Sequence, residues 1–147
     1  MMLPFWEGLV RTNHFDPEMA ALADRHYSRR TIGARQFCYS GRKLVLRDTQ
    51  ATVLFVWMWP QDGMRMDGQT GYSCAIFRNE GPRRSSDIIL EAEALAFAKW
   101  GRNRVFTYVN GAKIRSTNPG YCFLRAGWQR VGKTKGGLTL LAKEAAL

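Results

Sequence analysis

The segment "SSDIILEAEALAFAKWG" (85–101) carries the clearest helical pattern in the sequence. Ser and Asp residues suited to a helix cap open it, and Gly101 ends it. Its apolar residues recur at helical spacing and form one face: Ile88, Ala92, Leu95 and Ala96. The β-branched and aromatic segment "NRVFTYVN" (103–110) follows at once and predicts a strand directly after the helix.

Working outward from this helix, the rest of the chain alternates between strands and helices. Asp16 as N-cap and Pro17 at the first helical position start a helix over "DPEMAALADRHYS" (16–28). A short helix is expected near "PGYCFLRAG" (119–127). The remaining segments predict strands at 5–10, 43–48, 51–60, 72–80, 128–132 and 138–143, the last two as a hairpin. This order predicts one α/β domain over 1–147, with a central mixed, mostly antiparallel sheet flanked by about three helices.

Composition indicates a folded, soluble protein. Hydrophobic residues make up 46% of the chain, and there are five tryptophans. The longest apolar run, "TVLFVWMWP" (52–60), is shorter than the roughly 20 residues that span a bilayer, and we expect its Trp57, Met58 and Trp59 in the core. The start "MMLPFWEGL" lacks the pattern of a signal peptide. We therefore expect a cytoplasmic location and no membrane partner.

The cysteines give no sign of a metal site. The three of them are far apart and lack the Cys and His spacing of zinc ligands. We expect buried free thiols at Cys38, Cys74 and Cys122, and no metal.

The charge is strongly positive. Lys and Arg number 22 against 12 Asp and Glu, a net charge of +10. No acidic residue occurs between His26 and Arg47, and none between Ala94 and Lys143. If these two blocks meet in the fold, they form the basic face of a nucleic-acid-binding protein. A generally basic surface is the alternative.

The segment "RHYSRR" (25–30) combines a proton-transfer side chain with cations. Arginines bracket His26, Tyr27 and Ser28. Histidine has the side-chain pKa nearest neutrality, so the group could form a reactive centre for a polyanion. It could equally be the polar C-terminus of a helix, where His and Arg are favoured.

The last third of the chain carries a family resemblance. The element order and "CFLRAGWQRVG" (122–132), with Gly127 and Trp128, resemble the GNAT acyltransferase superfamily. The triplet "HYS", the strand ending "TYVN" and "NPGYCFLRAGW" (118–128) are together similar to the bacteriophage Mom-type proteins of that superfamily. The resemblance implies a single GNAT-like domain that adds a carbamoylmethyl or acyl-type group to the exocyclic amine of adenine in DNA.

The resemblance also implies a donor site with two departures. The segment "RNEGPR" (78–83) stands where an acetyltransferase has its pyrophosphate loop, with Arg83 in place of a small residue. The anion-binding residues expected there are Arg78, Gly81, Arg83, Arg84, Ser85 and Ser86. Phe123 occupies the position of the tyrosine that protonates a CoA thiolate, and Tyr121 lies about 200° away around a helix. The acyl donor therefore stays open between acyl-CoA and an aminoacyl ester.

The resemblance assigns roles to particular side chains. His26 would act as general base, Tyr27 would contact the base and Ser28 would orient a neighbour. A backbone N–H within Tyr72–Phe77 would polarise the acyl carbonyl. Further pocket residues are expected at Tyr108, Asn110, Ser116, Asn118 and Tyr121, although the Mom-like branch often has Asp where Asn110 stands. Phosphate contacts are expected from Arg25, Arg29, Arg30, Arg35 and Arg115.

Three functions follow from these expectations. The first is Mom-type modification of double-stranded DNA, with the adenine extruded from the helix. The second is an N-acyltransferase acting on aminoacyl-tRNA, as in toxin-type members of the superfamily. The third is a catalytically inactive GNAT fold that only binds nucleic acid.

Overall fold

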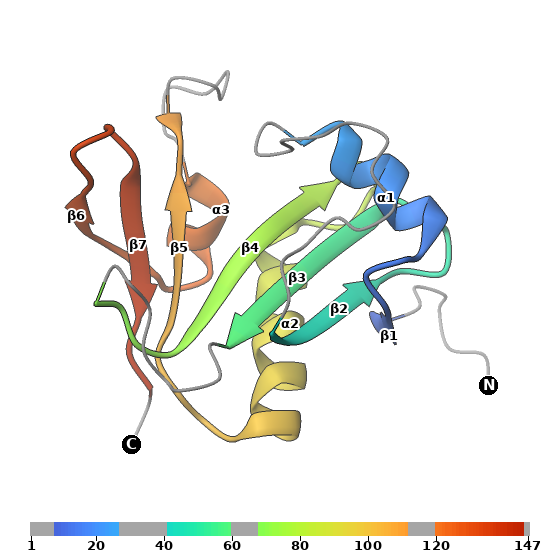
Figure 1. Ribbon diagram of the computed structural model, residues 1–147, viewed down its shortest axis with the longest axis horizontal. Helices are drawn as coiled ribbons and strands as arrows, with labels where there is room; N and C mark the ends of the chain where they lie inside the picture. The colour runs from blue at the N-terminus through green and yellow to red at the C-terminus, as the bar shows by residue number, and fades with distance from the viewer. Residues whose placement is uncertain (1–7, 27–40, 60–67, 112–119, 146–147) are drawn as a thin grey trace.

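The computed structural model describes residues 8–26, 41–59, 68–111 and 120–145. Strands and helices alternate as the sequence predicts (Figure 1). In chain order they are β1 (Val10–Thr12), α1 (Pro17–Asp24), β2 (Arg42–Arg47), β3 (Val53–Trp59), β4 (Tyr72–Asn79), α2 (Ser85–Trp100), β5 (Val105–Val109), α3 (Tyr121–Arg125), β6 (Gln129–Lys133) and β7 (Thr139–Lys143). In this part of the chain no helix has the length and apolarity to cross a membrane.

The strands form one 7-stranded sheet in the order β1-β2-β3-β4-β5-β7-β6. Neighbouring strands are antiparallel except for β4 and β5, which are parallel. A parallel pair needs a long crossover connection, and α2 supplies it. The predicted mixed, mostly antiparallel sheet is confirmed.

The helices cover both faces of the sheet. Alternation along β3 sends Phe55 and Trp57 to the face that α2 covers, and Leu54 and Val56 to the face that α1 covers. Helix α3 shares the face of α2, and its Phe123 belongs to the same core cluster. Figure 1 shows α1 alone on its side of the sheet. The result is a three-layer arrangement with two apolar cores.

Helix α1 begins as predicted and ends at Asp24. The Asp16 side chain accepts the N–H groups of Glu18 and Met19, which caps the helix, and Pro17 is its first residue. The helix stops at Asp24, because Arg25 and His26 donate to carbonyls three residues back rather than continuing the α-helical pattern. Arg25 and His26 therefore lie at the C-terminus of the helix, where the sequence placed them, while residues 27 and 28 lie outside the described part of the chain. Strand β1 begins at Val10, and residues 5–7 of the strand predicted over 5–10 also lie outside it.

Helix α2 has the expected end and an unexpected start. Gly101 closes it with a φ of +94°, which only glycine adopts readily. Arg84 is the N-cap, and no side chain caps the helix. The Ser and Asp cap that the sequence suggested is thus not formed. The Ser85 hydroxyl instead accepts a hydrogen bond from the Asn79 amide at 2.9 Å.

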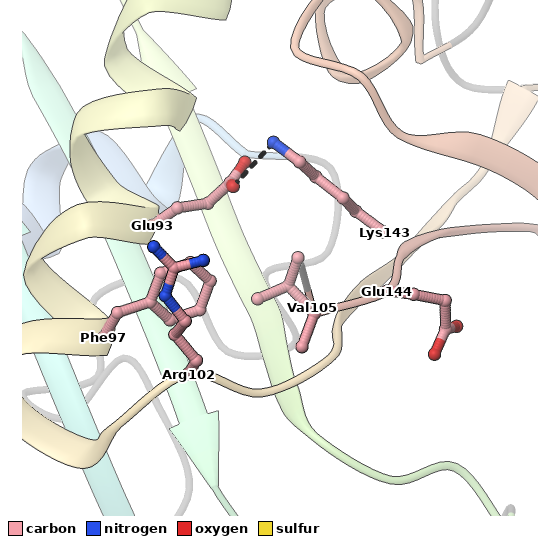
Figure 2. Close-up of a pocket in the computed structure, with 7 residues that line it drawn as sticks. Glu93, Phe97, Arg102, Val105, Lys143 and Glu144 are labelled. Atoms are coloured by element: carbon pink, nitrogen blue, oxygen red, sulfur yellow. Dashed lines mark hydrogen bonds and ion pairs between the residues drawn. The ribbon is translucent and has the colours of Figure 1, made fainter. Parts of the chain in front are cut away.

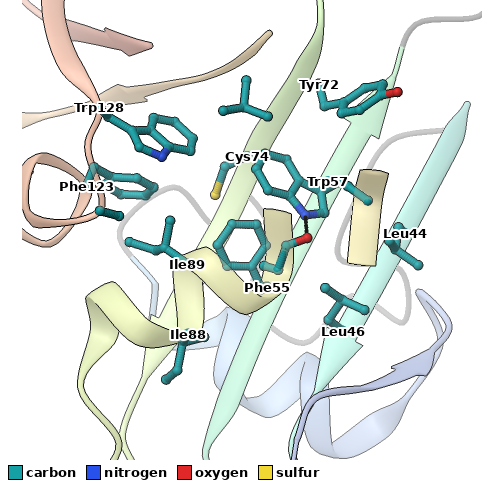
Figure 3. Packing of buried hydrophobic residues seen from close by; sticks show 14 of the residues in the cluster. Leu44, Leu46, Phe55, Trp57, Tyr72, Cys74, Ile88, Ile89, Phe123 and Trp128 are labelled. Carbon is teal, nitrogen blue, oxygen red and sulfur yellow. Dashed lines mark hydrogen bonds between the residues drawn. The ribbon is translucent and has the colours of Figure 1, made fainter. Parts of the chain in front are cut away.

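Two tryptophans join α2 to the sheet. Trp57 is fully buried, and its indole N–H donates to the Ala92 carbonyl at 2.9 Å (Figure 3). Trp128 stacks on Trp57 with ring centroids 6.3 Å apart. The expected core position of Trp57 is confirmed, while Met58 and Trp59 are partly buried.

Glu93 of α2 is a buried carboxylate, only 4% exposed. One oxygen accepts the Trp128 indole N–H at 2.9 Å, and the other accepts Lys143 Nζ at 2.9 Å. Lys143 also donates to the Ala126 carbonyl at 3.0 Å. Both carboxylate oxygens of Glu93 therefore have a hydrogen-bond partner, and its charge is paired with that of Lys143. Through these partners Glu93 links α2 to β7 and to the turn after α3.

Replacing Glu93 with Gln should lower the free energy of unfolding by about 2 kcal/mol, because the partly buried Lys143 then lacks its counter-charge. The double variant Glu93→Gln/Lys143→Met should lose less than the sum of the two single variants. Urea unfolding of the four proteins measures this coupling. Additive losses would show that the ion pair does not hold the fold.

Candidate functional site

Strands β4 and β5 separate to form a fork. They pair only at Tyr72↔Val105 and Ser73↔Phe106, although β4 continues to Asn79 and β5 to Val109. Figure 1 shows the two strands diverging beyond this point. We call the opening the β4–β5 fork.

The closed end of the fork is fastened by two polar contacts. The Tyr72 N–H donates to the Arg104 carbonyl at 2.8 Å. Further along, the Thr107 hydroxyl donates to the Cys74 carbonyl at 2.9 Å in a buried position. The Thr107 side chain thus joins β5 to β4 just beyond the last backbone pair. The carboxyl ends of β4 and β5 are left apart.

A β-bulge in β4 redirects its backbone into the fork. The pairing with β3 passes from Val56↔Ile76 to Trp57↔Cys74, so Ala75 is an extra residue. Before the bulge the Tyr72 N–H points to β5, but after it the Glu80 N–H donates to Thr52 on the β3 side.

An even number of residues separates Tyr72 from Glu80, and in a regular strand their N–H groups would face the same way. The bulge reverses this alternation. It therefore turns the N–H groups of Phe77 and Asn79 toward the open side of the fork. This agrees with the expectation that Tyr72–Phe77 offers an N–H to an acyl carbonyl.

Aromatic rings fill the α2 side of the fork. Phe77 of β4 packs against Phe123 of α3, with ring centroids 6.1 Å apart, and Phe123 lies 4.7 Å from Trp128. Phe123 is 6% exposed, so it lies in the core beside the fork and has no proton to give. Tyr121 is 52% exposed with the Arg125 guanidinium over its ring, and it does not take that place.

The segment after β4 is organised by its own side chains. The Asn79 amide donates to the Arg83 carbonyl at 2.8 Å, and its oxygen accepts the Gly81 N–H at 3.0 Å. A Cβ on Gly81 would collide with the Thr52 hydroxyl, so the close approach requires glycine. Arg83 pairs with Glu91 of α2 at 2.8 Å. Arg84 and Ser85 lie at the start of α2, with Arg84 exposed and Ser86 buried.

These contacts bear on whether the segment fits the pyrophosphate of CoA. The Gly81 N–H already has a partner, and Arg83 is held by Glu91. The loop therefore offers a phosphate the exposed Arg84, because the Gly81 N–H and Arg83 are already engaged. Arg78 is also hydrogen-bonded within the protein, to Glu80 and to the Arg25 carbonyl.

The end of α1 is tied to the end of β4. The Arg25 guanidinium holds Glu80 through two hydrogen bonds of 2.7 and 3.0 Å. Arg78 donates to the Arg25 carbonyl at 3.0 Å and to Glu80 at 2.9 Å. In this structure Arg25 and Arg78 therefore neutralise a carboxylate, and Arg25 is not directed to an external phosphate. The contacts place His26 beside the end of β4.

His26 is partly buried next to a cation. Burial and the Arg78 charge lower its pKa to about 4. The imidazole is therefore neutral at physiological pH and retains a lone pair that can accept a proton. The sequence argument relied on a pKa near neutrality, and the structure corrects it: His26 is available as a base, but a weak one.

Tyr108 of β5 lies on the face of the sheet opposite α2. It packs there with Phe106, with ring centroids 6.1 Å apart. Helix α1 covers that same face, so His26 and Tyr108 flank the fork on one side. Asn110 follows the end of β5. The other expected residues lie outside the described part of the chain: Tyr27, Ser28, Arg29, Arg30, Arg35, Arg115, Ser116 and Asn118.

A separate cavity of about 160 Å³ lies at the paired end of the fork. Figure 2 shows Lys143 reaching Glu93 on one side of it, with Phe97 and Arg102 beside them. Val105, where β5 begins, and Glu144 complete its wall. The cavity and the open end of the fork are thus distinct.

The described residues contain no group of three or more His, Cys, Asp or Glu side chains that could hold a metal ion. Cys74 is buried and Cys122 is partly buried, both as free thiols. Burial raises the pKa of both groups. Cys38 lies outside the described residues.

Sequence reasoning missed Glu93, Thr107 and Asn79. Glu93 lies among the apolar residues of the buried helix face, and a charged residue at such a position indicates a buried carboxylate that needs a partner. The Thr107 hydrogen bond spans the fork, and the Asn79 hydrogen bonds organise the loop after β4. Both depend on the folded structure, so no local sequence pattern predicts them.

Replacing His26 with Gln should remove a pH dependence of stability. The unfolded histidine binds a proton with its ordinary pKa of 6.5, and the folded one only near 4, so stability falls as pH falls between these values. Wild type should lose about 2 kcal/mol more than His26→Gln between pH 7 and pH 5. Urea unfolding at both values measures this, and His14→Gln is the matched control. Equal losses in wild type and His26→Gln would contradict the burial of a neutral imidazole.

Replacing Thr107 with Val should weaken the closed end of the fork. The buried Cys74 carbonyl loses a donor, which should cost about 1 to 2 kcal/mol and speed amide hydrogen exchange in β4. Thr139→Val on β7 is the control, with an expected change near zero. Similar stability losses in the two variants would show that the Thr107 bond has no special role.

Several solved structures resemble this one. An aminoglycoside 6′-acetyltransferase type Ii has a TM-score of 0.66 at 14% identity, covering 92% of this chain and 96% of the other. The aminoglycoside acetyltransferase AAC(6′)-Ib, in complex with coenzyme A, has a TM-score of 0.66 at 12% identity, with 93% and 94% covered. The GNAT domain of S. lividans PAT has a TM-score of 0.61 at 13% identity, with 92% and 89% covered.

Sequence comparison adds no nearer relative. No protein-family model matches the chain, and no curated protein matches it significantly. The structural matches nevertheless extend over nearly the whole length of each protein. The chain therefore has the GNAT acetyltransferase fold, as a single α/β domain with a mixed sheet.

Proposed function

We propose that this chain is a transferase that adds an acyl-type or carbamoylmethyl group to the exocyclic amine of adenine in DNA. The β4–β5 fork carries the proposal, because its bulge aims backbone N–H groups of β4 into an opening that can receive an acyl chain. The net charge of +10 favours a polyanionic acceptor over a small neutral one. The site of action would be the cytoplasm of a bacterial cell.

The chemistry requires a polarised carbonyl and a proton acceptor. In acyl transfer, the Phe77 N–H would donate to the carbonyl oxygen while the amine nitrogen bonds to the carbonyl carbon. The bond between the carbonyl carbon and the donor's sulfur or oxygen then breaks, and its electron pair leaves with the donor as a thiolate or alkoxide that takes up a proton from water. The amine nitrogen gives up a proton. His26, neutral at physiological pH, would accept that proton directly or through water. Even a weak base suffices once the new bond has made the nitrogen acidic.

The acceptor must leave the base stack before it can react. An adenine amine is a poor nucleophile in the duplex, and extrusion brings it into a site with little water. Tyr108 lies on the same face as His26 and would contact the extruded base. This assigns the α1 side of the sheet to the acceptor.

The leaving group distinguishes this chain from a standard acetyltransferase. Phe123 cannot protonate a thiolate, and its ring is buried between Phe77 and Trp128. Coenzyme A is bound in two of the structural neighbours, and acyl-CoA remains a candidate donor. An aminoacyl ester donor would not need the pyrophosphate loop, but its departing alkoxide, like a thiolate, would have to be protonated. The net charge of +10 suits tRNA as well as DNA, so the second candidate is N-acylation of aminoacyl-tRNA, with the amine of the aminoacyl group as acceptor.

The proposal predicts a modified base in host DNA. The protein would be expressed in bacteria, the DNA digested to nucleosides and a heavier deoxyadenosine sought by mass spectrometry. His26→Ala should abolish the product while folding and DNA binding persist, and His14→Ala should retain it. Unmodified DNA together with acylated charged tRNA would overturn the DNA proposal. Full activity of His26→Ala would remove His26 from the mechanism.

A further inference from the structure

We propose that α3 and β6 form a binding surface for the phosphate backbone of the nucleic-acid substrate. The identity of the polyanion rests on the proposed function. The surface, here called the α3–β6 strip, consists of one exposed tyrosine and four cations: Tyr121, Arg125, Arg130, Lys133 and Lys135.

A β-bulge brings the strand's cations to one face. Arg130 pairs with Leu141 and Lys133 with Thr139, while Val131 is an extra residue between them. In a regular strand, residues three positions apart point to opposite faces. The extra residue reverses the alternation of side chains once, so that Arg130 and Lys133 lie on the same side of β6.

That side is the one covered by α3. The partner strand β7 alternates so that Leu141 enters the core beneath α2 and α3, and Lys143 reaches Glu93 of α2. Cross-strand partners share a face, so Arg130 beside Leu141 points the same way. The cations of β6 and the exposed side of α3 therefore belong to one surface.

The strip is accessible and contains little opposing charge. All five residues of β6 are exposed at the edge of the sheet. The only acidic residue in 120–145 is Glu144, which pairs with Arg104. Lys143 is matched by Glu93 and contributes little to the surface. Residues 120–145 therefore carry a clear excess of positive charge.

The strip also offers a flat ring and begins next to the fork. Tyr121 is 52% exposed, and the Arg125 guanidinium lies 5.9 Å from its ring centre. An exposed ring beside cations is typical of surfaces that stack a base while holding its backbone. Helix α3 contacts the fork through Phe123 on the α2 side, so nucleic acid on the strip would lie beside the fork, and the extruded base would cross its open end to reach the α1 side.

Edge protection is the competing explanation for these cations. Charged residues and bulges on an edge strand prevent it from pairing with another chain. Protection depends on charge of either sign, whereas phosphate binding depends on positive charge. Reversing the sign separates the two roles.

The test compares Arg130→Glu/Lys133→Glu with a control, Lys99→Glu/Arg102→Glu, that makes the same charge change outside the strip. Binding to a short DNA duplex would be measured over a range of salt concentrations. The strip variant should bind at least about tenfold more weakly, and its salt slope should fall by about two. The control should change both values much less. Thermal unfolding and sedimentation confirm that each variant is folded and monodisperse.

Three outcomes overturn the proposal. Equal losses in the strip and control variants would show a general charge effect. An unchanged affinity and salt slope in the strip variant would leave its cations as edge protection. Full competition by free CoA at the strip would assign these cations to the donor instead.

The DNA modification assay separates failure of the strip from failure of the proposed function. Modified deoxyadenosine with unaltered binding by the strip variant rejects the strip and leaves the function standing. Strip-dependent binding without any modified base rejects the function and supports the strip.

Discussion

The carboxylate of Glu93 is the interaction on which the two halves of the sheet depend. Because β4 and β5 share only two residue pairs, little backbone bonding joins β5, β7 and β6 to the rest. Glu93 makes up for this from α2, by holding Lys143 of β7 and Trp128 before β6. Its buried charge would be costly without both partners. The contacts that join the two halves of the sheet therefore come from α2, and not only from backbone pairing between β4 and β5.

This arrangement explains why the fork can be both open and ordered. The Trp57 and Trp128 rings stack beneath it, and Phe123 closes the aromatic group against Phe77. The backbone beyond Cys74 is therefore supported from the α2 side, while none of the described strands pairs with the β5-facing edge of β4 there. Freed N–H groups on a rigid support are what stabilisation of a developing negative charge requires, since they need no rearrangement when that charge appears.

The sequence predicted what local pattern and spacing control. The apolar face of 85–101, the Asp16-Pro17 start and the Gly101 stop led to the correct helices, and the element order led to the correct sheet type. It could not reveal that Glu93 is satisfied from two distant strands. It also misjudged His26, because a histidine's pKa depends on burial and on Arg78, more than fifty positions along the chain. The family resemblance put Phe123 at the position of the tyrosine that protonates a thiolate, but only the structure showed that its ring is buried between Phe77 and Trp128.

The two bulges reveal a shared way of placing polar groups in this fold. An extra residue at Ala75 reverses which backbone N–H groups of β4 face the fork, and one at Val131 moves Lys133 to the side of Arg130. In each case one inserted residue shifts an alternation with a period of two, which no change of side chain could do. The first bulge redirects backbone donors and the second redirects cationic side chains. Both strands keep their pairing on either side of the insertion, with the register shifted by one residue, so the sheet stays continuous while the chemistry displayed on it changes.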